Sequence, residues 1–258
     1  PTYGRLPRNG SYPFVASLDH LGPFARSAHD LALMYDALQG WDARDPGCVQ
    51  RPNEPVATAL AKPIGGLRVG VLRGWFADHA GIEAQAAVTR VAAALGATVT
   101  LTLPGVDAAR AAAFLITNAE GAALHLADLR SRAADFEPLS RDRFLAGALL
   151  PAVWVQQAQR VRRVFALRVA EAMREVDVLL APATPVVAPR IGTEWLEIDA
   201  VIDRVRPTKG TLKEMMDQLE RWMLIESLRE HGNNKTAAAK SLGITREGLH
   251  KKLRAFGL

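Results

Sequence analysis

The sequence of 258 residues contains a single cysteine, Cys48. One cysteine excludes a disulfide scaffold and a zinc site with four cysteine ligands. The longest apolar stretch, residues 178–189, is interrupted by three prolines and is too short to span a bilayer. The first residues also lack the pattern of a secretory signal. We therefore expect a cytoplasmic protein that does not associate with membranes.

Motifs for catalysis are scarce as well. No serine lies in a G-x-S-x-G elbow, and Gly65-Gly66 precedes a strand pattern instead of forming a phosphate-binding loop between a strand and a helix. The histidines lack metal-ligand spacing. Asp19 and His20 are neighbours in sequence, but neighbouring side chains need not touch, and Cys48 has no histidine close in sequence. The residues alone therefore indicate no catalytic set, no metal site and no cofactor.

Acidic residues are nearly missing from the carboxyl-terminal end. From residue 233 onward, Glu247 is the only acid against six basic residues, so this end carries +5. The whole chain, with 32 basic and 27 acidic residues, also carries +5, and residues 1–232 are therefore neutral overall. A polyanion would be attracted to the carboxyl-terminal end. The basic residues there are Lys235, Lys240, Arg246, Lys251, Lys252 and Arg254.

The larger part of the chain has the pattern of an α/β body. Residues 67–72 and 97–103 predict short strands, and the alanine-rich segment 82–95 between them predicts a helix. A strand, a helix and a strand with short connections indicate a unit of a parallel sheet. Helical patterns dominate residues 106–176, and residues 177–181 predict a third strand.

The composition then changes. Residues 206–210 (RPTKG) have the composition of a linker, so we predict two domains, residues 1–210 and residues 211–258. The second domain begins with an amphipathic helix that runs to Gly232. Its apolar face consists of Leu212, Met215, Leu219, Trp222, Met223 and Leu228.

The last residues predict two short helices joined by a tight turn. Asn234 can cap a helix over residues 235–242, and Gly243 suits the turn because glycine tolerates a positive φ. Thr245 can cap a third helix that runs to about Phe256. A short helix, a glycine turn and a basic second helix form a helix-turn-helix, whose second helix can enter the major groove of DNA.

A basic, solvated helix end that only closes a small bundle is the alternative interpretation. Three features together favour DNA binding over it: the alanine-glycine turn, the amphipathic third helix and the concentrated positive charge. In that helix we expect an inner, apolar set and an outer, basic set. The inner set is Ile244, Leu249, Leu253 and Phe256, and the outer set is Arg246, His250, Lys251 and Arg254.

Three segments of this end carry a family resemblance: NNKTAAA at 233–239, LGI at 242–244 and REGLHKKL at 246–253. They closely resemble the helix-turn-helix of the factor-for-inversion-stimulation (Fis) type, which also ends many bacterial enhancer-binding activators. The resemblance covers residues 212–258 and implies binding to double-stranded DNA as a homodimer, with helix 212–230 as the interface. It implies DNA contacts by Asn234, Thr236, Thr245, Arg246, His250, Lys251, Lys252 and Arg254.

A second resemblance covers residues 1–210. The segments PTYGR (1–5), RNG (8–10) and SLDHLGPFARS (17–27), followed by GLRVGV (66–71) and DVLLAPATP (177–185), resemble the amidase signature family. The branch most similar to them acts on small urea-like amides such as biuret and related carboxyureas. The resemblance implies an α/β body with a mixed sheet and helices.

The amidase signature family uses a serine nucleophile, a second serine on a cis peptide and a lysine, all in motifs before the PTYGR block. The resemblance therefore implies no catalytic residue in this chain, and an amidase body that is incomplete at both ends. An incomplete sheet exposes strand edges and apolar surface.

Three functions follow as hypotheses. The first is sequence-specific DNA binding through the helix-turn-helix, fused to a catalytically incomplete amidase-like body. The second is hydrolysis of a small amide substrate, which requires that a missing amino-terminal catalytic segment be supplied. In the third, the amidase-like body is an interaction or regulatory platform for the DNA-binding end.

Overall fold

The computed structural model describes residues 1–189, 191 and 212–258. The predicted linker 206–210 and the predicted domain boundary near residue 210 lie outside the described residues. Among the helices that are described, none is both long enough and apolar enough to cross a membrane.

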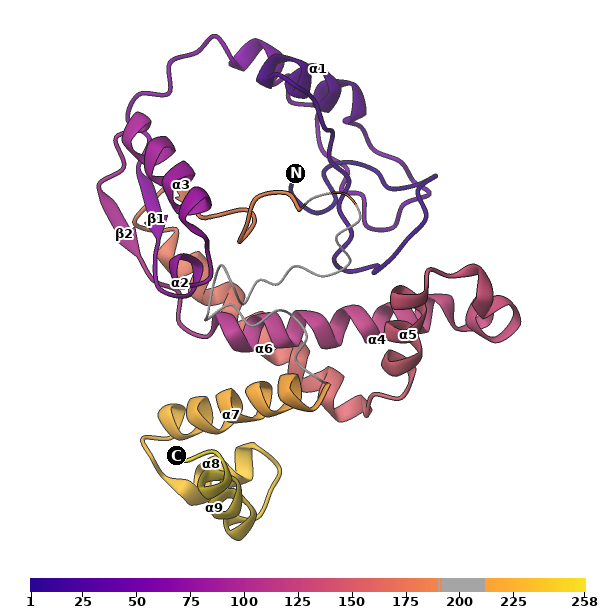
Figure 1. The fold of residues 1–258 in the computed structure, drawn as a ribbon, viewed down its shortest axis with the longest axis vertical. Helices are drawn as coiled ribbons and strands as arrows, with labels where there is room; N and C mark the ends of the chain where they lie inside the picture. Colours follow the sequence, from indigo (N-terminus) through magenta and orange to yellow (C-terminus); the bar gives the residue numbers. More distant parts are fainter. Residues whose placement is uncertain (190, 192–211) are drawn as a thin grey trace. The chain divides into compact units, whose positions relative to one another are not determined.

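The described residues form two compact units (Figure 1). The first unit combines Pro1–Gly66 with Phe114–Val155, and the second combines Leu67–Ala113 with Gln156–Leu258. Each unit therefore brings together segments that are far apart in the sequence. The long helix α4 (Val106–Arg132) begins in the second unit and ends in the first.

The first unit consists of irregular chain and helices. Ser27 caps α1 by accepting a hydrogen bond from the backbone N–H of Asp30 at 3.0 Å. The larger apolar side chains of α1 are exposed, with Leu33 at 49% and Met34 at 43%. The helical elements of this unit, besides the end of α4, are α1 (Ala28–Leu38), η1 (Ala57–Ala59), η2 (Ala133–Asp135), α5 (Pro138–Ala148) and the start of α6 (Ala152–Ala172).

Two glycines allow α4 and α5 to approach closely. A Cβ atom at Gly147 of α5 would overlap the backbone of Asn118 in α4. A Cβ atom at Gly121 of α4 would overlap the buried ring of Phe144 in α5. At Gly147 the backbones of the two helices therefore touch, and at Gly121 the Phe144 ring packs directly on the backbone of α4. Only a residue without a side chain permits either contact.

A buried ion pair holds the irregular chain of the first unit together. The Arg8 guanidinium Nη2 lies 2.8 Å from Oδ1 of Asp45, and the backbone N–H of Arg8 donates to Oδ2 of Asp45 at 2.8 Å. Asp45 is only 5% exposed. The hydrogen bond from Arg8 holds the pKa of the Asp45 carboxyl well below its ordinary value, more than offsetting the opposite effect of burial.

The second unit contains a three-stranded parallel sheet in the order β2-β1-β3. In the register, Gly70 of β1 (Val69–Leu72) pairs with Val99 of β2 (Val99–Leu101) and with Leu179 of β3 (Val178–Leu180). All residues of β1 are buried, as expected for a central strand. The predicted α/β body is therefore confirmed, and its three described strands all run parallel.

Helices follow the central strand in the predicted order. The short helix α2 (Trp75–Asp78) and then α3 (Ile82–Ala94) connect β1 to β2, completing the predicted strand-helix-strand unit. Three further helices end the chain, as predicted from its last residues: α7 (Leu212–Glu230), α8 (Lys235–Ser241) and α9 (Arg246–Ala255).

Candidate nucleic-acid interface

The end of α7 and the start of α8 are fixed by backbone hydrogen bonds and one side-chain cap. Asn233 has a positive φ of 62°, and its N–H donates to the carbonyl oxygen of Leu228 at 2.7 Å, which closes α7. The Oδ1 atom of Asn234 then accepts from the N–H groups of Thr236 and Ala237 at 3.1 and 3.2 Å. Asn234 is thus the predicted N-cap of α8.

The turn between α8 and α9 depends on Gly243. This residue has a φ of +70°, and the N–H of Ile244 donates to the carbonyl oxygen of Ala239 at 3.0 Å across it. Thr245 follows at once as the N-cap of α9, because its Oγ1 accepts from the N–H of Gly248 at 3.0 Å. Both features were predicted from the sequence, and the structure confirms them.

A small apolar core joins the three helices. Leu224 of α7, Ala238 and Ala239 of α8, and Leu249 and Leu253 of α9 are all buried. Partly buried side chains pack around this core: Leu228, Leu242, Ile244 and Phe256. Burial of Leu249 and Leu253 fixes which side of α9 faces inward, and the predicted inner set is confirmed.

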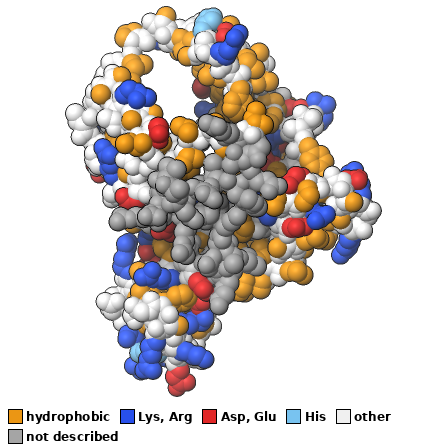
Figure 2. Space-filling model, in the orientation of Figure 1, with side chains coloured by type: hydrophobic (Ala, Val, Ile, Leu, Met, Phe, Trp, Pro, Cys, Tyr) orange, Lys and Arg blue, Asp and Glu red, His pale blue; other side chains and the backbone are white. Residues whose placement is uncertain are grey.

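The opposite side of α9 is basic. Arg246, Lys251 and Arg254 are exposed, and His250 is half-buried. Arg246, His250 and Arg254 recur every four residues and so form one row along the helix. Lys251 lies next to this row. Figure 2 shows Lys and Arg side chains over the end of the molecule that Figure 1 draws as α8 and α9.

Lys252 differs from the other predicted contact residues. It is half-buried, and its ammonium group forms an ion pair with the carboxylate of Glu220 in α7. Its side chain therefore points toward α7 and ties α9 to that helix. No local pattern indicated this pair, because the two residues lie 32 positions apart, 252 against 220.

The start of α8 carries two polar residues that were predicted to contact DNA, and one lysine that was not among the predicted contacts. Asn234 and Thr236 are exposed, and the Asn234 oxygen is occupied by its capping hydrogen bonds. Lys235, between them, is also exposed and is the first residue of α8. Its position beside the two predicted residues is the signal that could have identified it.

In the first unit, the structure separates the side chains that could suggest catalysis. Oδ2 of Asp19 accepts from the N–H groups of Phe14 and Val15, each at 2.8 Å. The His20 ring instead contacts the carbonyl oxygen of Leu18, with Nδ1 at 2.5 Å. The adjacent pair Asp19-His20 therefore forms no dyad in this structure.

Two further candidates of this unit, Cys48 and His125, are buried, and each contacts a backbone carbonyl oxygen. Cys48 is buried, with Sγ 3.5 Å from the carbonyl oxygen of Gly40. Nε2 of buried His125 lies 2.8 Å from the carbonyl oxygen of Pro13, and its ring stacks on Tyr12. Within the described residues, no group of three or more His, Cys, Asp or Glu side chains could hold a metal ion.

Family models match both parts of the chain. Residues 1–207 match the model described as Amidase. The chain belongs to the amidase family. Residues 216–256, which include all of α8 and α9, match the model described as Bacterial regulatory protein, Fis family. Both resemblances proposed from the sequence motifs are thereby confirmed.

The amidase region resembles several curated proteins. AtzE, a 1-carboxybiuret hydrolase subunit from Pseudomonas sp. (strain ADP), is 53% identical over 212 residues, which cover 82% of this chain and 46% of that protein. A glutamyl-tRNA(Gln) amidotransferase subunit from Pseudomonas aeruginosa (strain LESB58) is 36% identical over 220 residues, covering 74% and 46%. The chain spans about half the length of the curated relatives it matches.

Solved structures show the same amidase fold. One belongs to a vestigial protein complex described as revealing the evolutionary origins of an s-triazine catabolic enzyme. It matches with a TM-score of 0.72 and 54% identity over 77% of this chain and 44% of that chain. A glutamyl-tRNA(Gln) amidotransferase subunit from Thermotoga maritima matches with a TM-score of 0.61 and 24% identity, covering 78% and 45%, and this likeness shows the fold alone. The predicted amidase-signature-like body is confirmed.

Proposed function

We propose that the carboxyl-terminal region binds double-stranded DNA sequence-specifically, with α9 in the major groove. The observation that carries this proposal is the two-sided character of α9: buried leucines on one side, and exposed Arg246, Lys251 and Arg254 on the other. A helix of this kind fits the major groove, where each base pair presents a distinct pattern of donors and acceptors. The match of residues 216–256 to the Fis family model supports the same function.

Residues at the start of α9 are assigned to base edges. The recognition helix of a helix-turn-helix contacts bases through its N-terminal residues, and Arg246 is the first residue of α9. Its guanidinium suits a bidentate contact to O6 and N7 of guanine. His250 lies one turn further along the same row. Thr245 precedes Arg246 and Lys251 follows His250, so we assign Thr245, His250 and Lys251 to base edges or the nearest phosphates.

The remaining predicted contacts are assigned to the phosphate backbone. Arg254 extends the exposed row, and Asn234 and Thr236 are exposed polar residues at the N-terminus of α8. Lys252 can contact a phosphate only if its ion pair with Glu220 breaks. Contacts of this kind fix the register of a protein on DNA and make binding dependent on salt.

We further propose a homodimer through the helix over residues 212–230, acting as a transcription regulator in a bacterial cytoplasm. A two-fold dimer would place two copies of α9 in successive major grooves, about 34 Å apart. The expected DNA site therefore contains two inverted half-sites separated by one helical turn.

Selection of binding duplexes from a random pool with the full chain, followed by fluorescence anisotropy, tests the proposal. We expect one enriched sequence motif. We also expect the affinity to fall by about tenfold or more over a fourfold rise in salt concentration, because several phosphate contacts would be screened. An R246A/K251A variant should lose binding, whereas K62A, which removes an exposed lysine of the first unit, should keep it. Equal binding by both variants, or no enrichment, would overturn the proposal.

A second candidate function is hydrolysis of a small urea-like amide after a separate polypeptide supplies the catalytic segment. The observation that favours it is the 53% identity over 212 residues with AtzE. The test mixes the full chain with a polypeptide corresponding to the remaining half of that relative and measures ammonia release from biuret and carboxyureas. Turnover by the mixture but by neither component alone supports it, and a stable complex without turnover rejects it.

A further inference from the structure

Helix α7 packs on α6 as well as on α8 and α9. Nη2 of Arg168 in α6 lies 2.6 Å from Oε2 of Glu226, and the two side chains are only 17% and 13% exposed. The same guanidinium lies 5.5 Å from the centre of the Trp222 ring and donates to the carbonyl oxygen of Pro104 at 3.1 Å. A Cβ atom at Gly105 would lie 2.8 Å from Nε1 of Trp222, so the indole packs directly on the backbone there. This part of the contact between α6 and α7 is therefore filled.

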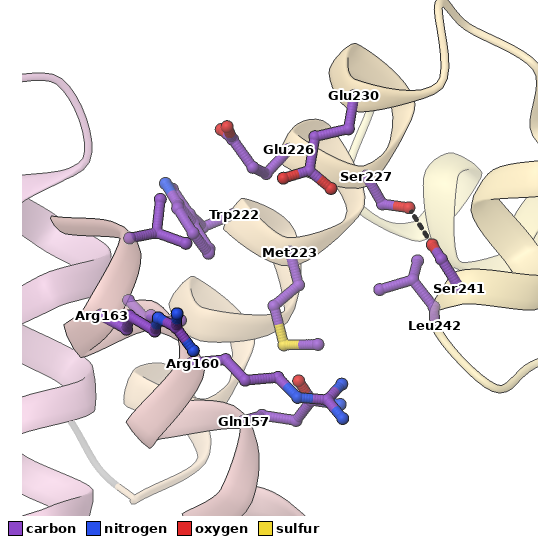
Figure 3. Close-up of a pocket in the computed structure, with 12 residues that line it drawn as sticks. Gln157, Arg160, Arg163, Trp222, Met223, Glu226, Ser227, Glu230, Ser241 and Leu242 are labelled. Carbon is purple, nitrogen blue, oxygen red and sulfur yellow. Dashed lines mark hydrogen bonds between the residues drawn. The ribbon is translucent and has the colours of Figure 1, made fainter. Parts of the chain in front are cut away.

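Beside the ion pair the contact is open. A cleft of about 280 Å³ lies between α6, α7 and the end of α8 (Figure 3). Well-packed interiors leave few voids larger than a water molecule, whereas small-molecule sites begin at about 300 Å³ and are lined mostly by apolar side chains. The cleft therefore has the size of a small ligand site. Its apolar lining is Val161, Val164, Trp222, Met223 and Leu242.

Several polar groups that line the cleft already have partners in the chain. The hydroxyl groups of Ser227 and Ser241 are hydrogen-bonded to each other, as the dashed line in Figure 3 shows. Oε2 of Glu226 is paired with Arg168, and its Oε1 lies 3.6 Å from Nη2 of Arg229. These groups therefore have little capacity left to bind a ligand.

Two arginines of α6 differ from these groups. Arg160 and Arg163 line the cleft, and their guanidinium groups form no ion pair or hydrogen bond with the residues that the structure describes. They lie three positions apart, on the same side of the helix. In Figure 3, Gln157, Arg160 and Arg163 lie at one end of the cleft and Glu230 at the other. One end of the cleft is therefore positively charged and has donors available.

An anion with an apolar body fits a cleft of this kind. The guanidinium group of an arginine can hold both oxygens of a carboxylate through parallel N–H donors. The volume of about 280 Å³ is nearly twice that of an apolar cavity of about 150 Å³ that holds benzene. An aromatic ring with a short acidic side chain therefore fits, and the thioether of Met223 can make favourable contacts with such a ring.

We propose that the cleft between α6 and α7 binds a small aromatic carboxylate, with the carboxylate on Arg160 and Arg163 and the ring against Met223 and Leu242. Such a ligand contacts α6, α7 and the end of α8 at once. Because it binds only where these helices are packed together, its binding stabilises their packing. No residue of α9 is among the described residues that line the cleft, so the proposal does not depend on DNA binding.

Isothermal titration calorimetry of the full chain with three compounds tests the proposal. Phenylacetate has the ring and the charge, phenylacetamide has the ring without the charge, and acetate has the charge without the ring. We expect phenylacetate to bind at least about tenfold more tightly than either of the others, since the ring needs the apolar lining and the charge needs the arginines. No binding of phenylacetate, or equal affinity for phenylacetamide or acetate, would overturn the proposal.

Variants of α6 locate the site. R160A/R163A should weaken phenylacetate binding at least about tenfold and leave phenylacetamide unaffected. R90A/R174A is the matched control, because it removes two exposed arginines of the same unit that do not line the cleft, and it should bind phenylacetate as the wild type does. Equal binding by the two double variants would reject this site.

Hydrogen exchange provides a second, independent measurement. Phenylacetate should slow the exchange of amides in α7 and α8 of the wild type and have no effect on those of α1 in the first unit. Protection that appears elsewhere and not in α7 and α8 would place the ligand outside the cleft and overturn the proposal. If circular dichroism shows that R160A/R163A has lost helix, R160Q/R163Q takes its place with the same expected loss of binding.

Discussion

The hydroxyl oxygen atoms of Ser227 in α7 and Ser241 in α8 lie 2.7 Å apart, and both lie within hydrogen-bond distance of the carbonyl oxygen of Ala238, at 3.2 and 2.9 Å. A hydroxyl has one hydrogen to donate, so one serine donates to the carbonyl while the other donates to its neighbour. Ser227 is 5% exposed. This triangle fixes α8 on α7 with polar contacts at the edge of an otherwise apolar core.

We predict that S227A and S241A each lower the free energy of opening of α8 by about 1 kcal/mol, the usual value of a protein hydrogen bond. The double variant should lose less than the sum, because both serines share one bond. Hydrogen exchange of the α8 amides in the full chain measures this. S131A, which removes an exposed serine of α4, is the control and should change nothing. Simple additivity would contradict a shared bond.

The turn glycine provides a second prediction. A Cβ at Gly243 would meet no atom within 4 Å, so G243A tests only the cost of a φ of +70° in a residue with a side chain. That cost is about 1–2 kcal/mol. We expect faster hydrogen exchange in α8 and α9 and weaker DNA binding.

Gly257 supplies the matched control for this variant, because it has a φ of 65° and an equally open surrounding but follows α9. G257A should leave DNA affinity nearly unchanged. Equal losses of affinity in the two variants would show that the α8–α9 turn has no special role.

We expect Arg246 to contact a base and Lys251 to contact a phosphate, and the two roles predict different losses of DNA binding. If Arg246 reads guanine, R246A costs about 1–3 kcal/mol and relaxes preference at one base position. K251A should weaken binding to all sequences alike, and reduce the slope of log affinity against log salt by about 1. Anisotropy titrations over a panel of single-base variants measure both. Uniform loss in R246A would reassign Arg246 to a phosphate.

The buried pair of Arg8 and Asp45 predicts a pH dependence of the first unit. The pKa of Asp45 is depressed in the folded state, so its contribution to stability is complete above the ordinary carboxyl range. It fades as the pH falls from about 4 toward the depressed value. D45N leaves Arg8 without its partner and should cost about 3 kcal/mol at pH 7.

Denaturant unfolding of D45N and the wild type between pH 7 and pH 3 checks this. The difference in free energy of unfolding should narrow as the pH falls. D128N, which breaks an exposed ion pair with Arg132, should cost only a few tenths of a kcal/mol. A difference between D45N and the wild type that stays constant with pH would contradict the assignment.

Much of the fold could be predicted because its signals are local. The caps Asn234 and Thr245 and the turn at Gly243 depend on residues within a few positions, and the helices lie where these signals place them. The strands were placed correctly but are shorter than predicted: residues 97–103 contain β2 (Val99–Leu101), because a strand extends only where a partner pairs with it.

Contacts between distant residues were not visible in the sequence. The pair of Lys252 with Glu220 and that of Arg168 with Glu226 join helices whose relative positions depend on packing. Nothing in the sequence around Lys252 indicated that its side chain would pair with an acidic residue of another helix. Charge and periodicity therefore identified the basic side of α9, while its attachment to α7 needed the structure.

Because α7 contacts α8 and α9 on one side and α6 on another, its sequence is free to change on only one narrow strip of the helix. Gln218, Arg221 and Ile225 are exposed and follow one another at three or four positions along the helix. Evolutionary drift among descendants of this chain should concentrate on these three positions, whereas Trp222, Leu224 and Ser227 should change only together with their partners. The strip is also where a fluorescent label or a purification handle could be attached without disturbing either neighbour of α7.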